Sequence, residues 1–272
     1  MGSDDQSERP LVAFVHIQKT AGTSVKFILK HSFGLTHCDV NPIDPAPGRI
    51  FAAPDLALVR RVYPRLRSIS GHEIVEPTRH LGAAVTPCTM LREPVARTIS
   101  HFQDKQIRGR ADLDIDDFLD DPAQHDFQVR KIAGGPDLDK AKALLEERYF
   151  FVGLTERFAE SMRLFARVCP YPIDLRSRRQ NSARDDSIRR RLRGNRVVLE
   201  RIREVNRLDA ALHRYVAEIL LPERLAAAGG IDESPLPLWS ARRPPLRFVL
   251  SRAYHRGVYR TVLKRARRQA TA

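Results

Sequence analysis

Short apolar runs alternate along the chain with longer segments in which apolar positions recur at helical spacing. The runs at 11–17, 67–70, 83–91 and 149–152 predict strands, and the continuous apolar character of 83–91 is typical of a strand buried on both faces. Helical spacing predicts helices at 25–33, 55–62, 95–105, 112–121, 125–133, 137–148, 155–168, 188–220 in two pieces, and 246–268. Strands that alternate with helices predict an α/β fold, with a parallel sheet flanked by helices.

The segments outside these elements suggest how the chain is divided. The first ten residues are polar and predict a disordered tail, while 36–64 is rich in Pro, Asp and Gly and predicts a loop around one short helix. Gly153 is expected to close the strand at 149–152. We expect one domain over 11–223 and a basic, helical C-terminal extension over 224–272.

The first apolar run leads into the short loop Gln18–Ser24, and a helix follows. In this arrangement backbone N–H groups and the helix N-terminus face the same point, and both favour negative charge. Lys19 adds a full positive charge, and Thr23 and Ser24 add hydroxyl donors. Gly22 allows close approach of the backbone to a phosphate. The stretch therefore predicts a phosphate-binding loop.

A second candidate anion site lies at the end of the run at 83–91. Arg92 follows the predicted strand directly, and Pro94 suits the first turn of a helix. An arginine can hold a phosphate with two hydrogen bonds, and Ser100, two helical turns later, can add a neutral donor. Lys19, His72 and Arg92 each lie just past a predicted strand end, so we expect all three on one rim of the sheet.

These two stretches carry a family resemblance. The order H-I-x-K-T-x-G-T-S differs from the nucleotide P-loop GxxxxGK[ST], because the lysine precedes the glycine. It resembles the 5′-phosphosulfate loop of sulfotransferases that use 3′-phosphoadenosine-5′-phosphosulfate (PAPS). The similarity is greatest to carbohydrate sulfotransferases of the heparan-sulfate 2-O type and their bacterial relatives. Residues 92–102 resemble that family's 3′-phosphate motif, R-[DE]-P-x-x-R-x-x-S-x-[FY], at the family's distance of about 70 residues.

The resemblance implies a P-loop-type parallel sheet, the sulfotransferase fold, with a nucleotide bound at its rim. It assigns the 5′-phosphosulfate to the loop residues Lys19, Thr20, Ala21, Gly22, Thr23 and Ser24, and the 3′-phosphate to Arg92 and Ser100. Two further segments, 128–134 and 181–184, are similar to family segments near the nucleotide. They imply roles for Arg130 and Arg184 in binding PAPS.

The implied reaction is transfer of the sulfuryl group to a hydroxyl of a carbohydrate or glycoconjugate, with 3′-phosphoadenosine-5′-phosphate (PAP) as the second product and no metal. Lys19 suits the leaving phosphate, and His72, in a Gly-His segment similar to the family's catalytic histidine, suits the general base. Glu73 is the alternative, either as the base or as the group that orients His72. His16 is expected to pack under the loop, and His101 to lie on a solvated helix face.

Charge widens the choice of partners. The net charge is +14, and residues 241–272 hold ten Arg or Lys and no Asp or Glu. Nucleic acid, an anionic membrane and an acidic polymer all suit such charge, but no nucleic-acid-binding motif accompanies it. Arginines at 60, 61, 65, 67, 97 and 108 either hold an anionic acceptor or are solvated. The tail either lies on an anionic membrane or packs on its own domain or another subunit.

Two other functions remain open on sequence grounds. A P-loop kinase or NTPase is one, although no clear Walker-B acid is present; a non-catalytic nucleotide-binding module is the other. The three cysteines lack metal-ligand spacing, and no apolar run reaches ~20 residues. These features predict a cytoplasmic bacterial enzyme, and the basic tail leaves membrane association open.

Overall fold

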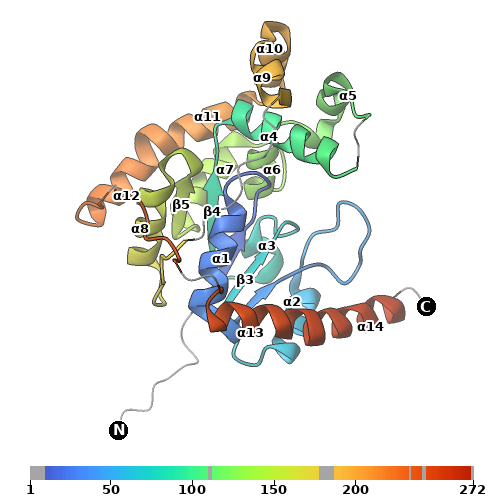
Figure 1. The fold of residues 1–272 in the computed structure, drawn as a ribbon, viewed down its shortest axis with the longest axis vertical. Helices are drawn as coiled ribbons and strands as arrows, with labels where there is room; N and C mark the ends of the chain where they lie inside the picture. Colours follow the sequence, from blue (N-terminus) through green and yellow to red (C-terminus); the bar gives the residue numbers. More distant parts are fainter. Residues whose placement is uncertain (1–9, 110–111, 178–186, 233, 241–242, 271–272) are drawn as a thin grey trace.

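The computed structural model describes residues 10–109, 112–177, 187–232, 234–240 and 243–270. They form a five-stranded parallel sheet in the order β2-β3-β1-β4-β5, with helices packed around it (Figure 1). The strands are β1 (Leu11–Val15), β2 (His37–Asp39), β3 (Ser68–Gly71), β4 (Val85–Leu91) and β5 (Phe151–Leu154). The predicted fold class, a parallel sheet flanked by helices, is confirmed.

Helices make up most of the remaining chain. The α-helices are α1 (Gly22–Phe33), α2 (Ala53–Val62), α3 (Pro77–Leu81), α4 (Pro94–Ile107), α5 (Ile115–Asp120), α6 (Phe127–Ala133), α7 (Leu138–Glu147), α8 (Phe158–Val168), α9 (Ser187–Arg193), α10 (Arg196–Val205), α11 (Arg207–Tyr215), α12 (Leu221–Ala227), α13 (Leu246–Tyr254) and α14 (Arg260–Ala270). Short 3₁₀ turns are η1 (Gly34–Thr36), η2 (Pro122–Gln124) and η3 (Thr155–Arg157), and π-helical turns are η4 (Val216–Leu220) and η5 (His255–Tyr259). The segment at 188–220, predicted as two pieces, is divided further, because Asn195 caps α10 and Asn206 separates it from α11.

β1 is the central strand, and all five of its residues are buried. It pairs with β3 on one side and with β4 on the other, so that Val12 faces both Ser68 and Thr86. The chain reaches β2 and β3 on one side of β1 and then crosses to β4 on the other. A parallel sheet binds ligands at such a reversal, beyond the carboxyl ends of its strands. The loops after β1, β3 and β4 therefore meet at one edge.

Three local features differ from the sequence expectations. β2 and α3 were not predicted, since both are very short, and β2 is an edge strand within the segment expected to be a loop. Asp39 holds β2 through long-range partners: it accepts a hydrogen bond from Ser70 Oγ and forms ion pairs with Lys26 and Lys30 of α1. Gly153 lies inside β5 instead of closing it, and a Cβ there would meet Met90 Sδ at 2.7 Å.

The apolar side chains form two clusters. The larger one surrounds the sheet, and the predicted C-terminal extension contributes Leu225, Leu236, Tyr259 and Leu263 to it. α12 also runs across the expected boundary at residue 223, so the extension continues the main fold. The smaller cluster joins α4, α5, α9 and α10 through Ile99, Phe102, Phe118, Leu192 and Ile202, among others. It holds α9 against α4, close to Arg92.

Two residues of α4 are more buried than the sequence suggested. His101, expected on a solvated helix face, is buried, and its ring makes an edge contact with Phe118 at a centroid distance of 5.6 Å. Burial lowers the pKa of His101 to about 3. Arg97, one of the arginines considered for an acceptor, is fully buried over the Phe127 ring and is therefore not a surface cation.

Buried His101 predicts a specific loss of stability in acid. Its folded pKa lies below its unfolded value, so its contribution is complete above pH ~6.5 and falls as the pH drops toward about 3. We expect His101→Gln to flatten the fall of the unfolding free energy between pH 6 and pH 4 by up to ~1.4 kcal/mol per pH unit. Urea unfolding at several pH values measures this, with His80→Gln as the control. Equal slopes in both variants would contradict it.

Candidate anion-binding and active site

The loop between β1 and α1 has the backbone shape of an anion site. Lys19 and Ala21 have left-handed φ values of 70° and 60°, and Thr20 lies between them. Thr20 is buried, and its Oγ1 donates to the Ile17 carbonyl over 3.0 Å, which fixes the turn. Left-handed residues within a turn direct neighbouring N–H groups into one concavity, which suits an anion. Each such residue costs ~1–3 kcal/mol, a strain that is typical of functional sites.

The N-terminus of α1 adds to the same concavity. Ala21 is its N-cap residue and provides no side-chain acceptor. α4 differs, because its N-cap Glu93 accepts hydrogen bonds from the Val95 and Ala96 amides at 2.9 and 2.7 Å. A carboxylate thus already occupies the N-terminus of α4, whereas at α1 the positive end of the helix dipole faces the loop.

Arg92 lies against this loop. Its Nη1 donates to the Lys19 carbonyl over 3.1 Å, so the side chain from the end of β4 touches the loop after β1. Gln128 of α6 fixes the Arg92 backbone from both sides, accepting from its amide and donating to its carbonyl, each over 2.9 Å. Burial lowers the pKa of Arg92, the negative charge of Glu156 opposes this, and the nearby positive charge of Arg189 adds to the lowering.

α4 presents a polar face to the loop. Lys19 Nζ lies 3.3 Å from Asp104 Oδ1, and both side chains are less than a third exposed. Ser100 is buried one turn before Asp104, on the same side of the helix. The face that carries Ser100 and Asp104 therefore looks toward Lys19. Asp104 was not predicted as a site residue, and only the packing of α4 brings it there.

His72 follows β3 and has the hydrogen bonding of a base. Its Nδ1 lies 2.8 Å from the His16 carbonyl. A carbonyl only accepts, so we assign the proton to Nδ1, which leaves Nε2 as the acceptor nitrogen. Burial lowers the pKa of His72. Lys131 Nζ donates to the His72 carbonyl over 2.5 Å and fixes the backbone. The histidine is thus neutral near pH 7, with a lone pair available on Nε2.

Glu73 is close enough to influence the base. Its negative charge opposes the effect of burial on the pKa of His72, and it does the same for Lys131, whose pKa burial also lowers. Its backbone carbonyl accepts from the Phe51 amide over 2.9 Å, which anchors the segment after His72. This placement suits both roles considered for Glu73, a second base and a group that acts on His72.

His16 joins the loop to the base. Its ring stacks on His72 at a centroid distance of 3.9 Å and an interplanar angle of 28°. It also lies directly beside Gly22, where a Cβ atom would come within 1.8 Å of His16 Nε2. Burial lowers the pKa of His16 to about 2, so the prediction that it packs under the loop is confirmed. A residue without a side chain is thus needed at position 22 to make room for the His16 ring, in addition to the room that a bound anion would need.

Two further residues were predicted to bind PAPS. Arg130 Nε donates to the His125 carbonyl over 3.0 Å, and Arg130 lines a cavity with Glu204 and Arg207. Arg184 lies outside the described residues. Two residues that were not predicted, Arg189 and Arg193 of α9, act electrostatically on Arg92. The arginine-dense sequence at 176–203 was the available signal, but it does not reveal where α9 packs.

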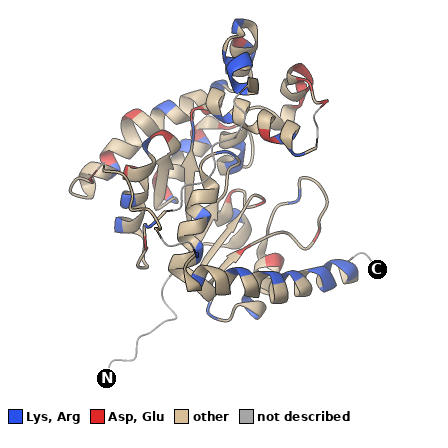
Figure 2. Ribbon diagram, viewed as in Figure 1, with Lys and Arg blue, Asp and Glu red and all other residues tan. Residues whose placement is uncertain are grey.

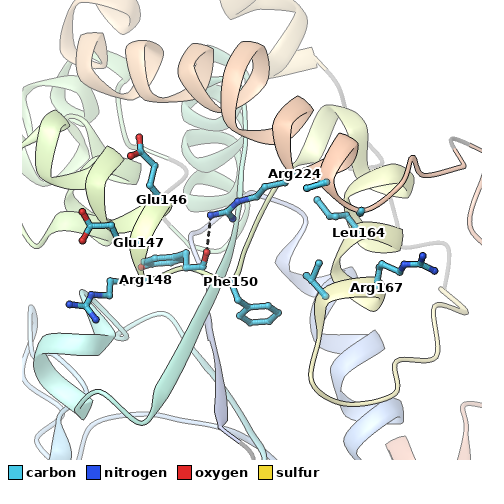
Figure 3. Close-up of a pocket in the computed structure, with 11 residues that line it drawn as sticks. Glu146, Glu147, Arg148, Phe150, Leu164, Arg167 and Arg224 are labelled. Carbon is cyan, nitrogen blue, oxygen red and sulfur yellow. Dashed lines mark hydrogen bonds between the residues drawn. The ribbon is translucent and has the colours of Figure 1, made fainter.

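Figure 3 shows a cavity of about 620 Å³ between α7, α8 and α12. Its residues at 146–150 precede β5, so it lies toward the amino end of the sheet, whereas the loop follows the carboxyl end of β1. Arg224 crosses this cavity and donates to the Leu145 and Tyr149 carbonyls at 2.5 and 2.9 Å. These bonds link α12 to the end of α7 and the segment before β5, which is a structural role. We do not assign the cavity to the candidate site.

Within the described ranges, no group of three or more His, Cys, Asp or Glu is placed to hold a metal ion. Cys38, Cys88 and Cys169 are free thiols. A comparison with protein-family models gives no match, and a comparison with curated proteins gives none either.

Among solved structures, the chain is similar to a crystal structure of a sulfotransferase from Alicyclobacillus acidocaldarius. The TM-score is 0.40 and the identity 17%, over 75% of this chain and 96% of that one. A likeness at this level does not establish a relationship. We therefore base the function on the geometry of the site.

A substitution that adds a single methyl group at residue 22 tests the contact between Gly22 and His16. We expect Gly22→Ala to lower the free energy of unfolding by ~1–3 kcal/mol, because the buried ring must move. Gly135→Ala is the matched control, since a Cβ at Gly135 meets nothing within 4 Å. Urea unfolding compares the two variants. An equal effect of both substitutions would show that the ring moves freely.

Proposed function

We propose that this protein is a sulfotransferase that moves the sulfuryl group of PAPS to a hydroxyl of a carbohydrate or glycoconjugate. The observation that carries the proposal is the loop at 18–22, with left-handed residues at Lys19 and Ala21 and the Arg92 guanidinium against it. A strained loop, an uncapped helix N-terminus and two cations around one point favour a ligand with several negative charges.

The residues around the loop fit the 5′-phosphosulfate end of PAPS. The loop amides and the α1 N-terminus would surround the phosphate, with the hydroxyls of Thr23 and Ser24 at the first turn of the helix. Lys19 would place its charge beside the bridging oxygen, with Asp104 as its partner when no anion is bound. We infer that the phosphosulfate takes the place of the Asp104 carboxylate beside the Lys19 ammonium group.

Arg92 and Ser100 fit the 3′-phosphate. Arg92 is held in place by Gln128 and has the like charges of Arg189 and Arg193 nearby. Glu156 offsets part of this positive charge, and a phosphate beside Arg92 would be attracted by all three arginines. Glu93 already occupies the amides at the N-terminus of α4, so the phosphate would be held by the Arg92 side chain and not by those amides.

The proposed reaction is an in-line displacement at sulfur. The acceptor oxygen forms a bond to sulfur as the bond between sulfur and the 5′-phosphate oxygen breaks, and the acceptor proton passes to His72 Nε2. The leaving oxygen becomes anionic beside Lys19, which stabilises it. The tautomer assigned to His72 supports this role, because the hydrogen bond of Nδ1 to the His16 carbonyl leaves Nε2 as the nitrogen that can accept a proton.

The sequence suggests several arginines as partners of an anionic acceptor. Arg60, Arg61 and Arg65 are exposed, but they precede β3 and so lie toward the amino end of the sheet, away from the loop. Arg97 is excluded from this role by its complete burial. Roles for Arg130 and Arg184 in binding PAPS stay predictions from the sequence.

Calorimetric titration with PAP, ATP and AMP tests the donor. We expect PAP to bind much more tightly than AMP, which lacks the 3′-phosphate, and ATP to bind weakly. Arg92→Ala should weaken PAP binding roughly 10–100-fold, because it removes charged hydrogen bonds. Arg148→Ala, at the distant cavity, is the matched control. Preferred binding of ATP would support the kinase or NTPase alternative instead.

Turnover tests the base. We expect His72→Ala to retain PAP binding and to reduce transfer of labelled sulfate roughly 10²–10⁴-fold, measured with a panel of glycans and glycolipids. Because burial lowers the pKa of His72, activity should stay level as the pH falls to ~6.5 and decline only below that. Glu73→Gln should have the smaller effect. Unchanged turnover in His72→Ala, with a large loss in Glu73→Gln, would make Glu73 the base.

A further inference from the structure

The C-terminal helix packs along the domain with one side and leaves the other side open. α13, η5 and α14 form one continuous rod that crosses the lower part of the molecule in Figure 1. Ser251, Tyr259 and Leu263 are buried against the domain. Tyr254 Oη donates to the Val62 carbonyl over 2.7 Å, and His255 Nε2 donates to the Asp39 carbonyl over 2.8 Å. The rod is thus fixed in one orientation.

The docked side continues along the whole rod. Besides Tyr254, docked residues recur every four positions, at 251, 255, 259, 263 and 267. In a straight α-helix, residues four apart drift by ~40° at each step. The π turn η5 takes more residues per turn and reduces this drift in the middle of the rod. Near the end of α14, Arg267 still reaches the Pro42 carbonyl, at 2.7 Å.

The same spacing arranges the outward side. Arg252, Arg256, Arg260 and Lys264 are exposed at intervals of four, and we call them the basic stripe. Each directly follows a docked residue and therefore lies ~100° around the helix from it, on one flank of the rod. In Figure 2 blue segments recur along the rod, and no red segment lies on its described residues. Because the docked side is fixed on the domain, the four cations share one flank of the rod.

Apolar side chains are exposed on the same rod, and Val249, three positions before Arg252, lies ~60° from it around the helix. Leu246 is 71% exposed, Val249 43% and Leu250 45%, and Val258 follows on η5. Leu35 of η1, which is 50% exposed, lines the same surface hollow as Leu250. Large apolar side chains that gather on one exposed face indicate a partner, whereas scattered ones do not.

We propose that this face of the C-terminal rod binds the surface of an anionic phospholipid membrane. Cations alone would suit any polyanion, but exposed apolar side chains gain only where they can enter an apolar phase. A basic stripe together with exposed Leu and Val on the solvent side of one rod supplies both parts of interfacial binding. No described helix is both long and apolar enough to cross a membrane. The proposed contact therefore lies in the membrane surface, and it does not depend on the nucleotide site.

Co-sedimentation of the full chain with vesicles tests the proposal. We expect binding to phosphatidylcholine vesicles that contain phosphatidylglycerol, and none to phosphatidylcholine alone. Arg256→Glu/Arg260→Glu should weaken binding roughly 100-fold or more, since it replaces two attractive charges by two repulsive ones. Arg148→Glu/Arg167→Glu makes the same charge change at the cavity in Figure 3 and should retain most of the binding.

A second pair of substitutions separates a membrane from a soluble polyanion. Leu246→Gln/Val249→Gln leaves the charge unchanged and should weaken vesicle binding several-fold, while binding to immobilised heparin stays the same. Circular dichroism confirms that each variant is folded. Three results would overturn the proposal: no binding to anionic vesicles at low salt, an equal loss in both charge variants, or vesicle binding that ignores the Leu246 and Val249 substitutions. Self-association through Leu246 and Val249 in the absence of vesicles would also overturn it.

Discussion

The contact between Gly22 and the His16 ring holds the two halves of the candidate site together. His16 continues from the central strand, Gly22 begins the helix that follows it, and the ring lies directly between that helix start and His72. The His16 carbonyl also accepts the Nδ1 proton of His72. One residue thus sets both the position of the proposed base and the path of the phosphate loop. Any larger side chain at residue 22 would disturb both.

The electrostatics of the site follow from this arrangement. The ends of β1 and β4 bring Lys19 and Arg92 together, and Asp104 and Glu156 offset part of their charge. α9, held by the smaller apolar cluster, adds Arg189 and Arg193. The result is an excess of positive charge beside a strained loop. A highly charged anion would relieve the repulsion between the cations and satisfy the loop amides at the same time.

The C-terminal rod shows how one helix can serve two surfaces. Its docked residues extend the main apolar cluster, and its outward residues form the basic stripe. The sequence left open whether the tail packs on the domain or meets a membrane. The packing on the domain leaves the proposed membrane contact possible, since the two use different sides of the rod.

The sequence by itself determined the parallel α/β sheet, the loop that joins the first strand to the first helix, and the strand ends that carry Lys19, His72 and Arg92. These depend on local patterns of apolar spacing and on short motifs. It could not place β2, which is held by the distant partners of Asp39, or His101, which lies against Phe118 of another helix. Nor could it show that Asp104 pairs with Lys19, or that Arg189 and Arg193 lie close enough to act on Arg92. Such choices depend on how helices pack, because each helix presents several polar faces and only contacts far apart in the sequence decide which one turns toward the site.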